Sequence, residues 1–178
     1  LPGVSYITIG INGAGLYTYL DNSYFLRDLK QSPPDYFAFS VGTNDGFVPF
    51  SKFKPEEYRK NLEKMIDMVL EANPNCAILL TVPNDCYYKK RYPNKNTARQ
   101  REVIMNLAKK YQCGVWDFYD FMGGLGSSNT WREAGLMRED YVHFTEEGYH
   151  LKGELYIDAF LKYLNSIECQ NETSNREK

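Results

Sequence analysis

The sequence lacks any apolar run near the length of about 20 residues that a membrane-spanning helix needs, and no segment in it has the pattern of a signal peptide. It also lacks an excess of either charge, with 21 Lys and Arg residues against 23 Asp and Glu residues. The short apolar runs predict no membrane span. Because nucleic-acid binding depends on an excess of basic residues, we also expect no nucleic-acid partner.

Cysteine is scarce as well. Its four occurrences, Cys76, Cys86, Cys113 and Cys169, are too far apart for a Cys-x-x-Cys metal or redox motif. Cys76 and Cys113 each stand at the start of an apolar run, which is typical of buried thiols. The cysteines therefore indicate no metal site, and they leave the redox compartment open.

Hydrophobic residues make up 43% of the 178 residues, enough for one domain with a buried core. Short runs rich in β-branched and aromatic residues predict strands at residues 4–11, 36–41, 77–82 and 114–118. Apolar residues at helical spacing predict helices at residues 55–73, 97–111 and 146–167.

This alternation of strands and helices favours one fold class. Continuous apolar runs, rather than alternating ones, are typical of parallel strands covered on both faces. We therefore predict an α/β fold of the doubly wound type, a mostly parallel sheet flanked by helices, over residues 1–169. A polar tail at residues 170–178, without apolar periodicity, is expected to be disordered.

In such sheets a ligand binds beyond the carboxyl ends of the strands, so the residues after each predicted strand are the first candidates. The first strand leads into residues 10–15, where glycines let the backbone turn sharply and present bare N–H groups. An ordinary tight turn explains them equally well, and their spacing is not a dinucleotide fingerprint. After the second strand, the side-chain amide of Asn44 would suit a developing oxyanion, although an Asx turn is also typical of Asn-Asp-Gly.

Asp140 and His143 stand just before the last predicted helix, for which Thr145 is the expected N-cap. An Asp three residues before a His can accept a hydrogen bond from Nδ1, which leaves Nε2 free as a general base. A surface His beside an acidic residue is the alternative interpretation. The other histidine, His150, is expected to be solvated or to pack.

Four aspartates near strand ends, Asp35, Asp45, Asp85 and Asp117, would suit a divalent-metal site, but turn formation and helix capping are the commoner roles. The tyrosines within residues 87–92 would suit a carbohydrate-binding rim, with packing as the default interpretation. We expect no metal ion and no cofactor.

These residues resemble the sequence blocks of the SGNH hydrolases, also called GDSL-type esterases, in the order of that family. Ile11–Gly15 resembles the second block, and the oxyanion N–H of its glycine maps to Gly13. Gly42–Asp45 matches the third block, whose Asn maps to Asn44, and Asp140–His143 matches the fifth block, Asp-x-x-His. The resemblance covers nearly the whole chain and implies the flavodoxin-like fold of that family.

The chain departs from the family pattern in the first block. Gly-Asp-Ser, which carries the nucleophilic Ser and a central strand in that family, occurs nowhere in the sequence. We assign none of Ser5, Ser40, Ser127 and Ser128 as the nucleophile, because their sequence contexts differ from that block. Since the chain also opens on Leu1 rather than Met, we expect it to be the C-terminal part of a longer hydrolase, without its first strand. An N-terminal segment carrying the Gly-Asp-Ser block would then be its partner.

The chain is similar to the peptidoglycan O-acetylesterases of this family around residues 10–14 and at residues 122–124. That subgroup carries a carbohydrate-binding β-domain between its first and second blocks, and the analogy implies an exported or periplasmic protein.

The function that the resemblance implies is serine-type ester hydrolysis without metal or cofactor, such as deacetylation of a glycan or another O-acylated small molecule. Asp140 would orient His143, which would act as the base, while Gly13 and Asn44 would hold the oxyanion. Without its nucleophile this chain alone is expected to be inactive. Two alternatives stay open: a catalytically inactive glycan-binding or scaffold domain, and a metal-dependent phosphohydrolase on a similar sheet.

Overall fold

The computed structural model describes residues 3–176, with side chains as far as residue 166. The chain divides into two compact units, Leu1–Ser127 and Ser128–Lys178. In chain order its elements are α1 (Leu16–Leu20), α2 (Phe25–Gln31), β1 (Tyr36–Phe39), α3 (Thr43–Gly46), a 3-10 turn (Phe50–Lys52), α4 (Pro55–Ala72), β2 (Ala77–Thr81), β3 (Tyr87–Tyr88), β4 (Tyr92–Pro93), α5 (Asn96–Tyr111), β5 (Gly114–Trp116), α6 (Phe118–Phe121), α7 (Ser127–Glu133) and α8 (Glu146–Arg176).

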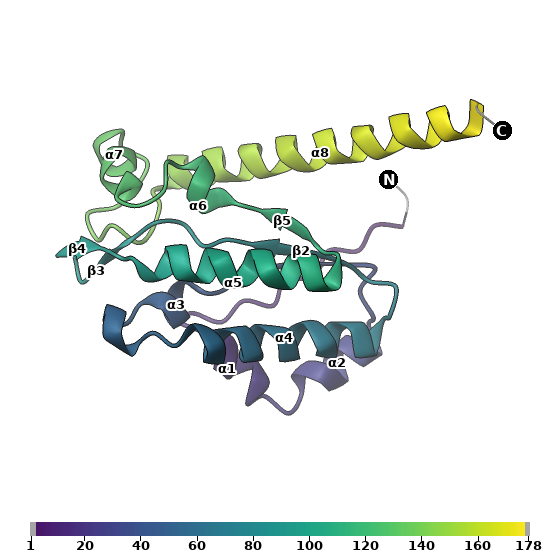
Figure 1. Cartoon of the computed structure of the whole chain (residues 1–178), viewed down its shortest axis with the longest axis horizontal. Helices are drawn as coiled ribbons and strands as arrows, with labels where there is room; N and C mark the ends of the chain where they lie inside the picture. The colour runs from purple at the N-terminus through teal and green to yellow at the C-terminus, as the bar shows by residue number, and fades with distance from the viewer. Residues whose placement is uncertain (1–2, 177–178) are drawn as a thin grey trace. The chain divides into compact units, whose positions relative to one another are not determined.

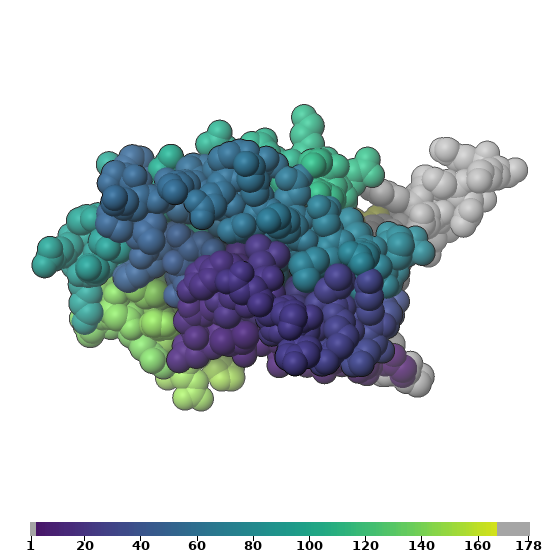
Figure 2. Space-filling model, turned by 90° about the horizontal axis from the view of Figure 1, so that it is seen from below, coloured from purple at the N-terminus to yellow at the C-terminus, as the bar shows by residue number. Residues whose placement is uncertain are grey.

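Strands β1, β2 and β5 form a parallel sheet in the order β1-β2-β5. Helices α4 and α5 make the two crossovers between them, and α1 and α2 pack on α4 (Figures 1 and 2). Tyr87–Tyr88 and Tyr92–Pro93 form a separate antiparallel hairpin, β3–β4. The predicted α/β fold with a mostly parallel sheet flanked by helices is confirmed, and the three strands end one or two residues earlier than expected.

The core of the first unit follows the predicted periodicities. Apolar side chains of α4, α5 and the sheet are buried together, among them Leu62, Ile66, Leu80, Ile104 and Leu107. The α4 sequence begins with Pro at its first turn, followed by two acidic residues, and both features favour a helix start. Because β1 and β2 are neighbouring parallel strands, the loops that follow them leave the sheet side by side, at the edge formed by the carboxyl ends of the strands.

The strand predicted at residues 4–11 is wrong: the structure has no strand within residues 3–12. The side chains of Val4, Tyr6 and Ile7 are 74%, 86% and 63% exposed, and the Tyr19 hydroxyl donates a hydrogen bond to the carbonyl oxygen of Ile9 (3.3 Å). A β-branched run becomes a strand only where another strand pairs with it, and within the described residues none does.

The second unit contains α7, a loop with an isolated antiparallel bridge between Met137 and Phe144, and the long helix α8. Helix α8 starts at Glu146 as predicted and continues to Arg176, so residues 170–176, expected as a disordered tail, are helical here. This stretch contains neither Gly nor Pro to stop a helix. No helix in the described part of the chain has both the length and the apolar character to span a bilayer.

Candidate active site

The turn after β1 carries the first group of candidate residues. Gly42 adopts a φ of +117° in the left-handed region and begins the four-residue helix α3. A Cβ atom on Gly42 would lie only 2.6 Å from the Tyr58 hydroxyl and 3.0 Å from Pro83. Only glycine fits both the backbone angle and the space, so the sequence here dictates a turn that holds Asn44 at the carboxyl edge of the sheet.

Asn44 is exposed, and its side-chain Nδ2 donates a hydrogen bond to the carbonyl oxygen of Ala14 (2.9 Å). This contact uses one of the two amide hydrogens and fixes the orientation of the amide, leaving the second hydrogen for another acceptor. Gly13, in the left-handed region at φ +73°, directly precedes Ala14. The structure thus brings the Gly13 turn and Asn44 together, although they are 30 residues apart.

The neighbouring Asp45 makes a second bridge between the same two turns. Its carboxylate accepts hydrogen bonds from the backbone N–H of Leu16 at 3.0 and 3.2 Å. Burial raises the pKa of Asp45, and the Leu16 N–H partly opposes that rise. Asp45 therefore links α3 to the chain that follows the Gly13–Gly15 turn by a hydrogen bond.

Asp140 and His143 form a hydrogen-bonded pair within the second unit, as the sequence predicts. Asp140 Oδ2 lies 2.9 Å from His143 Nδ1, and Oδ1 accepts the backbone N–H groups of Val142 (2.8 Å) and His143 (2.9 Å). Burial opposes ionisation of Asp140, but the hydrogen bonds from His143 and Val142 outweigh it and lower the pKa of the carboxyl. An ionised Asp140 fixes the Nδ1–H tautomer and leaves His143 Nε2 as the free nitrogen, on a side chain that is exposed.

The loop around this pair is built from local contacts. Tyr141 adopts a positive φ of 58°, and the backbone N–H of Arg138 donates to the carbonyl of His143 (2.8 Å). The Thr145 hydroxyl accepts the Gly148 N–H (3.2 Å) and donates to the carbonyl of Gly135 (2.8 Å), so the expected N-cap of α8 is confirmed. His150 is exposed on α8.

Three of the four aspartates considered for a metal site, Asp45, Asp85 and Asp117, have other partners. Asp117 caps α6 through the Asp120 N–H (3.2 Å) and pairs with Arg101 (2.6 Å), while Asp85 Oδ2 accepts the Gly126 N–H (3.1 Å). Within the described residues, no group of three or more His, Cys, Asp or Glu side chains is arranged to hold a metal ion.

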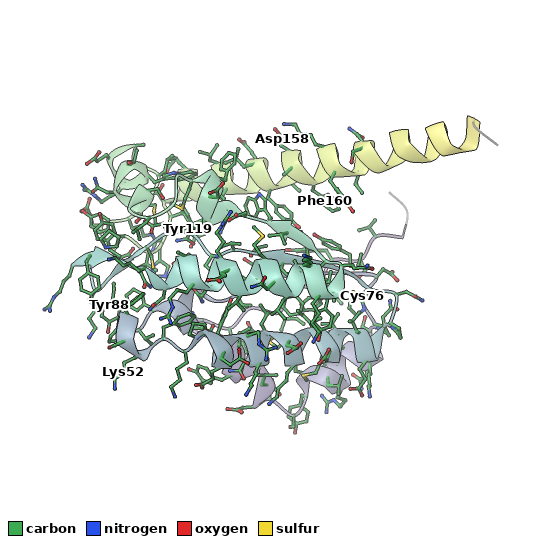
Figure 3. The ribbon with its side chains drawn as sticks, viewed as in Figure 1. Lys52, Cys76, Tyr88, Tyr119, Asp158 and Phe160 are labelled. Atoms are coloured by element: carbon green, nitrogen blue, oxygen red, sulfur yellow. The ribbon has the colours of Figure 1, made fainter. Side chains whose placement is uncertain are left out.

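Cys76 and Cys86 are not suited to replace the serine nucleophile. Burial raises the pKa of Cys76 to about 11, with added repulsion from Asp35, and burial also raises the pKa of Cys86 to about 11. Both are neutral thiols near pH 7 and hence poor nucleophiles. Figure 3 places Cys76 at the end of the sheet remote from Tyr88 in the β3–β4 hairpin. Cys169 lies outside the described side chains.

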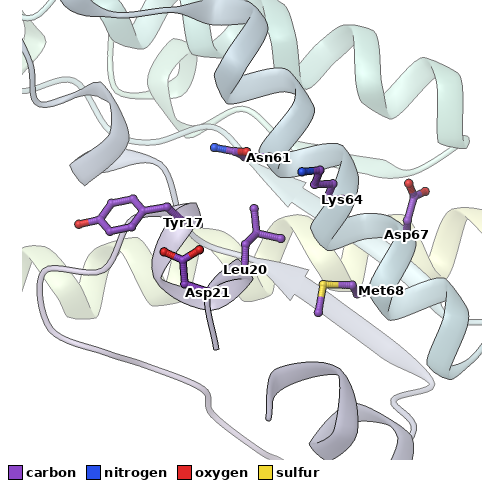
Figure 4. Close-up of a pocket in the computed structure, with 7 residues that line it drawn as sticks. All are labelled: Tyr17, Leu20, Asp21, Asn61, Lys64, Asp67 and Met68. Atoms are coloured by element: carbon purple, nitrogen blue, oxygen red, sulfur yellow. The ribbon is translucent and has the colours of Figure 1, made fainter. Parts of the chain in front are cut away.

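A shallow pocket of about 480 Å³ lies between α1 and α4 (Figure 4). The residues that line it are Tyr17, Leu20, Asp21, Asn61, Lys64, Asp67 and Met68. None of the residues proposed for chemistry is among them, so this pocket is separate from the turn that carries Asn44.

Sequence reasoning missed the polar residues beneath the Asn44 turn, namely Asn94, Asn96 and Gln100. All three are buried and hydrogen-bonded to the backbone of residues 42–48. Gln100 lies on the apolar face of α5, four residues before Ile104, and a lone amide on such a face is the signal that could have revealed it.

Comparison of the sequence and the structure with known proteins supports the α/β fold described above. A sequence model of the GDSL-like lipase/acylhydrolase family matches residues 1–151. A search of curated proteins finds no significant match. Among solved structures, a peptidoglycan O-acetylesterase is similar with a TM-score of 0.80 and 22% identity, over 88% of this chain and 46% of that protein. The chain therefore spans less than half of that relative.

Two further solved structures have the same fold. A lipase/acylhydrolase from Enterococcus faecalis matches with a TM-score of 0.61 and 19% identity, over 83% of this chain and 70% of its own. The acetyl xylan esterase AlAXEase matches with a TM-score of 0.64 and 21% identity, over 85% of this chain and 78% of its own.

Proposed function

Because this chain belongs to the GDSL-like lipase/acylhydrolase family, we propose that it supplies the base and the oxyanion-binding groups of a serine-type ester hydrolase. The observation that carries this proposal is the hydrogen bond of 2.9 Å between Asp140 Oδ2 and His143 Nδ1. It leaves His143 Nε2 as the nitrogen that accepts the proton of a serine hydroxyl, and the ionised Asp140 stabilises the imidazolium that forms.

Asn44 and Gly13 are the proposed oxyanion donors. As the ester carbonyl is attacked, negative charge develops on its oxygen, and fixed N–H groups stabilise that charge. The second hydrogen of the Asn44 amide and the backbone N–H of Gly13 are suited to this role, because the contact between Asn44 Nδ2 and Ala14 (2.9 Å) ties the two turns together.

The nucleophilic serine is proposed to lie on a segment outside these 178 residues, because Gly-Asp-Ser is absent from the sequence. Two features of the first unit support an additional strand. Within the described residues β1 is an edge strand that pairs only with β2, and residues 4–11 expose several apolar side chains. Open strand edges and exposed apolar segments are typical of surfaces that bind another strand.

The proposed substrates are acetyl esters of carbohydrates. The names of two structural relatives, a peptidoglycan O-acetylesterase and an acetyl xylan esterase, suggest this substrate class. The reaction would be attack of the serine on the acetyl carbonyl, release of the sugar hydroxyl with the proton from His143, and hydrolysis of the acetyl-enzyme by water that His143 deprotonates.

The test is acetate release by the complete protein that contains these residues, with p-nitrophenyl acetate, acetylated xylan and O-acetylated peptidoglycan as substrates. We expect His143→Ala to lower kcat by about 10²–10⁴-fold, the usual contribution of a general base, while His150→Ala, a matched change of the exposed histidine on α8, leaves kcat unchanged. Equal activity of the wild type and His143→Ala would contradict the proposal.

A second candidate function is glycan binding without hydrolysis, which the absence of Gly-Asp-Ser favours. It predicts that the complete protein binds acetylated and deacetylated glycan with similar affinity and releases no acetate. Isothermal titration with both forms of the glycan, alongside the acetate assay, separates the two functions.

A further inference from the structure

Three buried amides hold the two ends of the turn that carries Asn44. Gln100 Nε2 donates to the carbonyl oxygen of Gly42 (2.7 Å), at the start of α3. Asn94 Nδ2 (2.8 Å) and Asn96 Nδ2 (3.0 Å) both donate to the carbonyl oxygen of Gly46, at the end of α3. Asn44 lies between these two anchored carbonyl groups.

The anchors come from a distant part of the chain and are shielded from water. Gln100, Asn94 and Asn96 are 1%, 3% and 0% exposed, and Asn96 Nδ2 also donates to the carbonyl of Val48 (2.9 Å). Water cannot reach these buried groups to replace a lost hydrogen bond. Losing the Gln100 amide therefore leaves the Gly42 carbonyl held by the local N–H of Gly46 and removes its tie to α5.

Helix α3 depends on these contacts for its shape. A helix of four residues, Thr43–Gly46, makes too few internal hydrogen bonds to persist alone. The backbone N–H of Gly46 donates a helical hydrogen bond to the carbonyl oxygen of Gly42 (2.9 Å). The carbonyl groups of both residues also accept hydrogen bonds from the buried amides. Tyr58 closes the other side of Gly42, and burial, reinforced by the nearby Asp45 carboxylate, raises the pKa of Tyr58 so that its hydroxyl stays neutral.

We propose that three buried amides position Asn44 for oxyanion binding, namely those of Gln100, Asn94 and Asn96. None of the three needs to touch the substrate. They fix the carbonyl groups of Gly42 and Gly46, those carbonyls fix the direction of the short helix, and the helix directs the Asn44 amide. The catalytic consequence rests on the proposed function, whereas the positioning itself is a property of the turn.

The test replaces Gln100 by Met, which has a similar length and no donor group. In the complete protein, we expect hydrogen exchange of the peptide that covers residues 42–48 to accelerate at least about tenfold, because the turn opens locally. With p-nitrophenyl acetate, kcat should fall about tenfold or more with little change in KM, part of the ~10²–10³-fold loss typical of removing an oxyanion donor. Asn96→Ser, which keeps a good residue for a helix start but shortens the side chain, should act in the same direction and serves if Gln100→Met does not fold.

The matched control is Ile104→Ala, one turn further along the same buried face of α5. This substitution creates a cavity and lowers Tm without removing a hydrogen-bond donor to the turn. The hydrogen exchange rate of residues 42–48, compared with the rest of the unit, should therefore stay as in the wild type, and so should kcat. If Gln100→Met and Asn96→Ser match Ile104→Ala in both readouts, the amides are merely structural and the proposal is overturned. Absence of esterase activity, or full activity of Asn44→Ala, would overturn the proposed function instead, while the exchange comparison still decides whether the amides position the turn.

Discussion

The turn around Asn44 takes its hydrogen bonds from residues far away in the sequence, whereas the loop around His143 takes them from its immediate neighbours. Gln100 and Gly42 are 58 residues apart, and Asn44 and Ala14 are 30 apart. Asp140 and His143 are only three apart, and Thr145 caps the helix that follows directly. The proposed base and its carboxylate are therefore held by local contacts, whereas the proposed oxyanion donor depends on the packing of the first unit.

Within the turn around Asn44, the change with the largest expected effect replaces Asn44 itself. Replacing Asn44 by Ala should lower kcat of the complete protein about 10²–10³-fold, because an oxyanion donor acts only in the transition state. Steady-state kinetics with p-nitrophenyl acetate measures the loss, and circular dichroism checks the fold. Asn44→Asp, which has the same shape without the donor, should behave alike; a folded Asn44→Ala variant with wild-type kcat would remove Asn44 from the mechanism.

The same comparison explains which parts of the site were predictable. The spacing of Asp140 and His143 is enough to predict their hydrogen bond, because two residues three apart in a loop meet through local geometry. The partner of the Asn44 amide, Ala14, and the anchor Gln100 become neighbours only once β1, α5 and the first turn are packed together, so no local pattern could identify them.

The fold was predicted to a similar extent and for similar reasons. Strands form within residues 36–41 and 77–82, where β1 and β2 pair with each other, and the helical periodicity of α4 and α5, which connect the strands, is visible in the sequence. The run at residues 4–11 is richer in β-branched residues than either of these, yet it forms no strand in the structure. Strand formation needs a partner as well as a propensity, and propensity alone is what a sequence pattern reveals.

A smaller effect is expected when the local loop is broken. Replacing Thr145 by Ala removes the hydroxyl that caps α8 and that donates to Gly135 (2.8 Å), so it should lower the free energy of unfolding by about 1 kcal/mol. Urea denaturation measures the loss, and Thr145→Ser, which keeps the hydroxyl, should retain most of the stability. Hydrogen exchange in residues 42–48 should not change, and a change there would show that the two regions are not held independently.

The smallest expected effect is on the pH dependence of stability. Because the pKa of Asp140 is lowered in the folded protein, its ionised form adds stability above the ordinary Asp pKa of about 3.9, and this contribution is lost as the pH falls through the lowered value. The carboxylate is partly exposed, so the contribution should stay below about 1 kcal/mol after screening by solvent. Asp140→Asn should thus be less stable than the wild type in urea denaturation at pH 7, with the difference shrinking towards pH 3. A difference that is the same at both pH values would contradict the assignment.

Asp140 and His143 are proposed to activate a serine supplied from outside these 178 residues. The most direct measurement is labelling of the complete protein with a fluorophosphonate, followed by peptide mass spectrometry to locate the adduct. We predict an adduct on a serine of a Gly-Asp-Ser sequence that precedes residue 1, lost in His143→Ala and retained in His150→Ala. A folded protein that takes no label, or one labelled equally in His143→Ala, would contradict this claim.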